Sequence, residues 1–205
     1  MEATALDLVP GALRLQAEAF QTLLAQPRFG LRGALLVVFL AGLSSAIGQS
    51  VVLFANRVSP RRFAASLLLQ AVLFVLTFLV WAATVWAVAS GLMGRTPPFA
   101  AAAAAIGLAY APQLLSFLAL APFLGGPFSV ILSVWTLLTT LLATSVAFDL
   151  SRSETLVVAF AGWLASEVLG RTVGRPVVSI GRRIRHAVAG TELRPLEPPS
   201  RQGPS

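Results

Sequence analysis

Residues 96–148 read TPPFAAAAAAIGLAYAPQLLSFLALAPFLGGPFSVILSVWTLLTTLLATSVAF, and none of these side chains is charged. As a single α-helix the stretch would be about 80 Å long, whereas the hydrocarbon core of a bilayer is about 30 Å thick. The stretch is therefore too long for one crossing and about right for two. Proline and paired glycine disfavour a continuing helix. The sequence therefore predicts a hairpin turn that contains Pro122, Gly125, Gly126 and Pro127.

Shorter uncharged runs lie on either side of this stretch. An ionised side chain near the bilayer centre is costly, so charge-free runs mark membrane spans. A weaker apolar segment, 155–172, contains Glu167, and it crosses the membrane only if this carboxylate faces protein or pairs with Arg171 one helical turn away. We predict an all-α, polytopic transmembrane helix bundle over residues 31–172, with about five spans. The spans are expected near 33–55, 64–90, 100–121, 127–148 and 155–172.

The two ends of the chain differ from the middle. In the N-terminal segment, 1–30, apolar residues from Leu13 to Leu24 recur at helical spacing between Pro10-Gly11 and Pro27, which predicts an amphipathic helix on the membrane surface. As a helix, residues 173–190 would have an apolar face and a basic face, which is the pattern of an interfacial helix. Its arginines Arg182, Arg183 and Arg185 are expected to contact anionic lipid headgroups. The polar, proline-rich segment 191–205 is expected to be a disordered tail.

Composition restricts the chemistry of the chain. It is 57% hydrophobic and 11% charged, whereas soluble domains carry about 25% charged residues. It has no cysteine and one histidine, His186, which excludes thiol catalysis, disulfides and cysteine-ligated metals. Catalytic patterns such as H-E-x-x-H and G-x-S-x-G are absent. We therefore expect no catalytic, cofactor-binding or metal-binding residues, and no binding of nucleic acid.

The basic residues bear on orientation. All fifteen are arginine, and arginine-rich loops tend to stay in the cytoplasm. The count favours both chain ends inside, with 155–172 re-entrant or interfacial. Five spans with an external N-terminus also agree with the rule, so the count leaves two orientations open.

The third span carries one polar motif, formed by Gly107, Tyr110, Pro112 and Gln113. Proline inside a helix removes a backbone hydrogen bond, and in lipid the freed carbonyl needs another partner. One interpretation is a packing kink. The other is a hinge or a polar site, with Tyr110 and Gln113 supplying the side chains.

Hydroxyl residues form a stripe along the fourth span. They recur at steps of three or four residues, which places them on one helix face. The residues are Ser129, Ser133, Thr136, Thr140 and Thr144. Such a stripe usually packs against another helix, and Ala101–Ala105 of the third span offers a small partner surface. A permeation path is the alternative. In the first span, Ala41, Ser44, Ser45 and Gly48 form a similar small-residue packing surface.

A resemblance to a known family lies between Gly91 and Asp149. A long apolar span ends in Gly94-Arg95-Thr96, and it is followed by AIGLAYAPQ at 105–113, by Pro122 through Pro127, and by Val134-Trp135. This order resembles the Yip-type (Ypt-interacting protein) family of polytopic membrane proteins, especially its bacterial branch. The resemblance covers about residues 15–170.

The resemblance implies a five-span, all-helical domain with a cytoplasmic N-terminus. Eukaryotic relatives act in vesicle trafficking and contact Rab-type GTPases, whereas bacterial relatives mostly have no assigned biochemical role. This chain departs from the family pattern in its short N-terminal region and its basic C-terminal extension, so trafficking is not transferred to it.

Two functional hypotheses remain. The first is a non-enzymatic protein of the bacterial inner membrane that organises the bilayer or recruits partner proteins, with self-association included. The second is a small transporter or channel that uses the polar faces of spans three to five.

Overall fold

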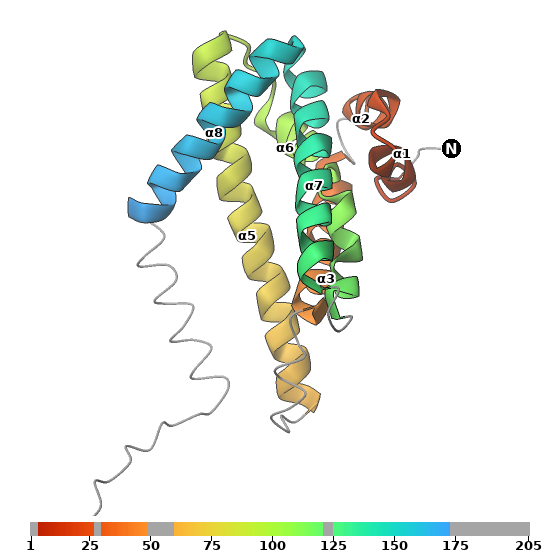
Figure 1. Ribbon diagram of the computed structural model, residues 1–205. Coiled ribbons are helices and arrows are strands. Elements are labelled where there is room, and N and C mark those ends of the chain that lie inside the picture. The colour runs from red at the N-terminus through yellow and green to blue at the C-terminus, as the bar shows by residue number, and fades with distance from the viewer. Residues whose placement is uncertain (1–3, 27–29, 49–59, 121–124, 173–205) are drawn as a thin grey trace, which may run out of the picture.

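The computed structural model describes residues 4–26, 30–48, 60–120 and 125–172, and every regular element in these ranges is a helix. The expected interfacial helix with Arg182, Arg183 and Arg185, the expected tail and Pro122 lie outside the described residues. The helices, shown in Figure 1, are α1 (Val9–Leu13), α2 (Ala17–Leu24), α3 (Gly30–Gly48), α5 (Pro60–Met93), α6 (Phe99–Leu108), the 3-10 helix η1 (Ala111–Leu120), α7 (Gly125–Phe148) and α8 (Arg152–Thr172).

Four helical segments of the described chain are long and apolar enough to cross a membrane. They are Gly30–Gly48, Phe63–Met93, Phe99–Leu120 and Gly125–Phe148. The predicted all-α membrane bundle is thereby confirmed for the first four spans. The fifth predicted segment is part of α8, a helix of 21 residues that packs on α5 and α7. Whether α8 crosses the bilayer stays a prediction, and the side chain of Glu167 lies outside the described part of the chain.

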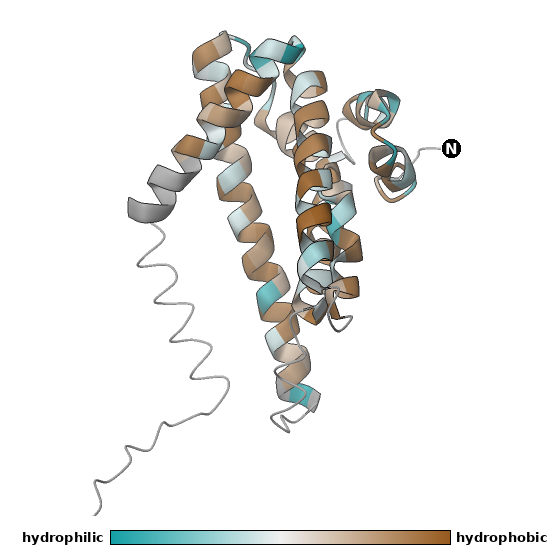
Figure 2. Ribbon diagram, viewed as in Figure 1, coloured by the Kyte–Doolittle hydropathy of each residue, from teal (hydrophilic) through white to brown (hydrophobic). Residues whose placement is uncertain are grey.

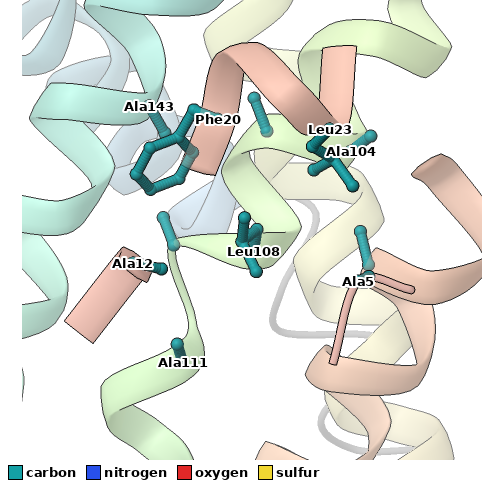
Figure 3. Packing of buried hydrophobic residues seen from close by; sticks show 11 residues of the cluster. Ala5, Ala12, Phe20, Leu23, Ala104, Leu108, Ala111 and Ala143 are labelled. Atoms are coloured by element: carbon teal, nitrogen blue, oxygen red, sulfur yellow. The ribbon is translucent and has the colours of Figure 1, made fainter. Parts of the chain in front are cut away.

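The centre of the bundle is α6, whose residues 102–108 are all buried. Its alanines let neighbouring backbones approach closely. On one side Ala104 and Leu108 share a buried cluster with Phe20, Leu23 and Ala143, seen in Figure 3. On the other side of α6, a second buried cluster joins it to α3, α5 and α8. The predicted alanine surface therefore serves several helices, and α7 is one of them.

Charged groups collect at one end of the bundle, where α5 leads to α6 and α7 leads to α8. Arg95 Nη1 lies 3.0 Å from Asp149 Oδ2 and donates to the Phe148 carbonyl at 3.2 Å. Gly94 has a φ of 65°, in the left-handed region that glycine tolerates best. We call this the ion-pair end. Figure 2 shows hydrophilic residues there and mainly hydrophobic residues along α5 and α7.

The N-terminal segment differs from the single helix that we expected. It forms two short helices, α1 and α2, on either side of Leu15, whose φ of 58° ends the first helix. Pro10 lies inside α1, because proline is accommodated in the first helical turn. Both helices pack on the side of the bundle: Phe20 is fully buried, and Trp135 Nε1 donates to the Leu13 carbonyl at 3.0 Å.

Three of the four residues predicted for the hairpin turn lie in the described part of the chain. Gly125, Gly126 and Pro127 form the first turn of α7, so this helix begins two residues before the predicted span 127–148, and Gly125 and Gly126 belong to the helix. The first amides of a helix have no intrahelical acceptor, so Pro127 costs no hydrogen bond there. Gly125 lies against the carbonyl of Ala119, where an added Cβ would be only 2.5 Å from the oxygen.

Candidate functional site

The third span is broken where the sequence places its proline. The helix α6 ends at Leu108, residues 109 and 110 form a turn, and the chain continues as η1 from Ala111. We expected a kinked helix over 100–121, whereas the structure has an α-helix followed by ten residues of 3-10 helix. Runs of 3-10 helix longer than four residues are uncommon, because their hydrogen bonds have poorer geometry. The segment therefore needs partners from its neighbours.

Ser44 of α3 supplies two of these partners. Its hydroxyl donates to the Leu114 carbonyl at 2.8 Å and accepts from the Phe117 amide at 2.9 Å. Ser44 is 8% exposed. Acyl chains form no hydrogen bonds, so without the Ser44 hydroxyl these two backbone groups would have no partner from the lipid. The sequence showed Ser44 only as a small packing residue. The sequence did contain a signal for this role, namely a serine in one span and a proline that breaks the helix in another span.

Gln113 ties η1 to α7. Its Nε2 donates to Thr136 Oγ1 at 3.1 Å, and its Oε1 accepts from Ser116 Oγ at 2.7 Å. Thr136 in turn donates to the Leu132 carbonyl. We call Ser44, Gln113, Ser116 and Thr136 the junction cluster, because together they connect α3, η1 and α7.

Tyr110 does not join Gln113. Its ring meets the edges or faces of three aromatic rings of α5, with centroid distances of 5.8 Å to Phe74, 5.4 Å to Phe78 and 6.3 Å to Trp81. Such edge-to-face pairs favour packing. Gly107 has a packing role as well, because a Cβ there would be 3.0 Å from the Ala34 side chain of α3. The residues of the predicted motif therefore contact three different helices: Tyr110 contacts α5, Gly107 contacts α3 and Gln113 contacts α7.

The hydroxyl stripe of α7 divides into two halves. Thr140 and Thr144 are buried, which agrees with packing against neighbouring helices. Ser129 and Ser133 are exposed, and their hydroxyls donate to carbonyls one turn back in α7. Thr136 lies between the halves and belongs to the junction cluster.

A cavity of about 220 Å³ opens beside the junction cluster. It lies between the C-terminal ends of α3 and η1 and the first half of α7, and none of the residues that line it is ionisable. The lining residues are Ser45, Gly48, Gln113, Ser116, Ala119, Ser129, Leu132 and Ser133. The cavity offers hydroxyl and amide groups to a neutral polar molecule.

At the ion-pair end, Ser151 and Glu154 cap α8. Glu154 Oε2 accepts from the Ser151 amide at 2.7 Å and from its hydroxyl at 2.8 Å, and these bonds hold the pKa of Glu154 below its ordinary value. The Ser-x-x-Glu spacing is a capping-box signal that our reading of the sequence missed.

The described part of the chain contains no group of three or more potential metal-ligating histidine, cysteine or carboxylate residues. No family model, curated protein or solved structure matches the chain. A function for the chain must therefore be inferred from its own residues.

Proposed function

We propose that the chain is a non-enzymatic, multi-pass protein of the bacterial inner membrane, Yip-like, that organises the bilayer or recruits partner proteins. The observation that supports this proposal best is the junction cluster. Its polar side chains are used to complete the backbone of η1 and to join three spans. Polar groups that hold the bundle together in this way are structural, whereas a reaction would need groups that exchange protons or electrons.

The outward-facing surface also supports this proposal. Large apolar side chains of α5, α7 and α8 are exposed, including Val80 at 56%, Val130 at 63% and Phe160 at 65%. Such a surface suits lipid and the flanks of other membrane proteins. The expected partners are the bilayer, with its anionic headgroups near Arg182, Arg183 and Arg185, and membrane proteins that include a second copy.

Proximity labelling tests the recruiting role. A promiscuous labelling enzyme fused to the C-terminus should mark a reproducible set of membrane proteins. The matched variant Arg182→Gln/Arg183→Gln/Arg185→Gln should mark fewer of them, because it lacks the basic face. The same enzyme fused to an unrelated multi-pass protein gives the background. A set of labelled proteins that does not differ from this background would contradict partner recruitment.

One observation favours a second candidate, a small transporter or channel for neutral solutes. It is the cavity of about 220 Å³ with Gln113 and serine hydroxyls in its lining. Proteoliposomes should then show a solute flux that Gln113→Leu abolishes. Gln70→Leu is the matched control, because Gln70 lies in α5 and not in the cavity lining. Absence of flux over a broad panel of neutral solutes would rule this candidate out.

A further inference from the structure

The position of α1 and α2 along α7 is unusual for surface helices. The Leu13 carbonyl accepts a hydrogen bond from Trp135, which lies near the midpoint of α7. Phe20 shares a buried cluster with Ala143, two turns further along α7. The two N-terminal helices therefore lie beside α7 from its midpoint towards the ion-pair end, as Figure 1 shows.

Charged side chains are exposed in α2 and at both ends of α1. Asp7, Arg14 and Glu18 are exposed, and Arg14 directly follows the residue that bonds Trp135. Figure 2 shows hydrophilic residues of α1 and α2 at the height of the hydrophobic part of α7. A bilayer of full thickness would place these charges deep among acyl chains, where charged side chains are expensive.

The opposite face of the bundle has a much longer apolar surface. On α5, exposed apolar residues extend from Leu68 to Leu92, a helix length of about 36 Å. On α8, Leu156, Val157, Phe160, Trp163 and Leu164 are also exposed. By contrast, α7 is only about 15 Å long from Gly125 to Trp135, where its contacts with α1 and α2 begin. Beyond Trp135, Leu137 and Leu138 are the large apolar residues of α7 that stay exposed.

We infer that the bilayer is thinned beside α1 and α2, where its surface is drawn from the ion-pair end down to the level of Trp135. The hydrocarbon layer on this face is then about half as thick as on the α5 face. Lipids adapt to a short apolar surface by thinning locally, and tryptophan prefers the membrane–water interface. Leu6 and Leu15, 43% and 40% exposed, anchor the pair of helices in that interface. The inference rests on the proposed membrane-organising role and names the bilayer as the partner.

Depth measurements with spin labels test this inference, since the chain has no cysteine and single sites can be labelled. Leu15→Cys reports the thinned face. Val80→Cys is the matched site on the lipid-facing side of α5, because Val80 precedes Gly94 by as many residues as Trp135 precedes Asp149. Each variant is placed in nanodiscs that hold one chain each.

The label on the Leu15→Cys variant should collide several-fold more often with a water-soluble nickel complex than the label on the Val80→Cys variant. The latter should collide mainly with oxygen, which concentrates among acyl chains. Equal depths for the two labels would overturn the inference. Shielding of the Leu15 site from both reagents would also overturn it, because another protein segment would then cover this face.

A charge substitution tests the cause of the thinning. Arg14→Leu with Glu18→Leu should let the bilayer surface rise, so the label at position 15 should move several-fold towards the oxygen-accessible regime. Arg14→Gln with Glu18→Gln keeps polar side chains and should move it much less. Both variants should unfold at the same temperature as the original chain, which would show that they are folded. An unmoved label in the leucine variant would contradict the inference, whereas loss of labelled partners in the proximity experiment bears on recruitment alone.

Discussion

Ser44 binds two backbone groups of the irregular third span. Its hydroxyl forms hydrogen bonds with both a carbonyl and an amide of η1. A buried backbone group that loses its hydrogen-bond partner costs free energy. In membranes this cost is moderated, because the unfolded chain also finds partners there.

We therefore expect Ser44→Ala to lower the free energy of unfolding by about 1–2 kcal/mol. The measurement is thermal unfolding in detergent followed by near-UV circular dichroism. Ser66→Ala is the control, because Ser66 donates only to the Phe63 carbonyl in its own helix. Equal effects of the two substitutions would show that the bonds of Ser44 to η1 are not important for stability.

Gly48 provides a second prediction at this scale. An added Cβ would overlap the carbonyl oxygen of Ser116, and backbone cannot move aside as a flexible side chain does. Gly48→Ala should destabilise the bundle by about 1–3 kcal/mol. Gly91→Ala meets nothing within 4 Å and should be neutral or stabilising by about 0.5–1 kcal/mol, because alanine favours helix. The same detergent unfolding assay measures both, and a neutral Gly48→Ala would contradict the close contact.

Among the elements, the third span shows what a sequence can and cannot predict. Uncharged runs located the first four spans, because the cost of burying charge is a property of each residue alone. The sequence also placed the helix break near Pro112. It did not separate Tyr110 from Gln113, since residues three apart share a face in a continuous helix. The turn at residues 109 and 110 rotates η1, so Tyr110 contacts α5 while Gln113 contacts α7.

Pro112→Ala tests this rotation. The substitution should leave membrane insertion intact and let α6 continue further, which would turn Gln113 away from Thr136. A short crosslinker between Gln113→Cys and Thr136→Cys should then react several-fold less efficiently in the Pro112→Ala background. Unchanged crosslinking and unchanged thermal stability in detergent would show that the proline does not set the packing.

The capping box of α8 predicts a dependence on pH. Because the bonds from Ser151 lower the pKa of Glu154, they stabilise the folded chain above the ordinary carboxyl pKa, and this contribution is lost as the pH falls through the lowered pKa. Glu154→Gln should be less stable than the original chain at neutral pH, and the difference should vanish in acid. A difference in thermal stability that does not change with pH would contradict this explanation.

For the whole molecule, Phe20 is a large buried contact between the N-terminal helices and the bundle. Its side chain is fully buried among residues of α6 and α7, whereas Leu6 is 43% exposed. Phe20→Ala should cost about 3–5 kcal/mol of packing and release α1 and α2. Limited trypsin digestion at Arg14 should then be several-fold faster than in the original chain. Leu6→Ala is the control and should digest at the original rate.

The whole arrangement could be predicted only in part. The composition shows that the chain is a membrane protein, and the spacing of Leu13, Phe20 and Leu24 indicates an amphipathic helix. Their partners lie far along the chain, so the docking of this segment against α7 was not visible in local patterns. The sequence predicted a helix on the membrane surface for the same reason: an apolar face alone does not say whether it contacts lipid or protein.

The bonds that connect η1 to its neighbours come from different parts of the chain. Ser44 precedes η1, while Thr136 follows it. Ribosomes make the chain from its N-terminus, so α3 is available when the third span is made, and α7 is still to come. The bonds of Ser44 to η1 can therefore form before the bond between Gln113 and Thr136, and the chain order allows the broken span to be held by α3 while α7 is still being made.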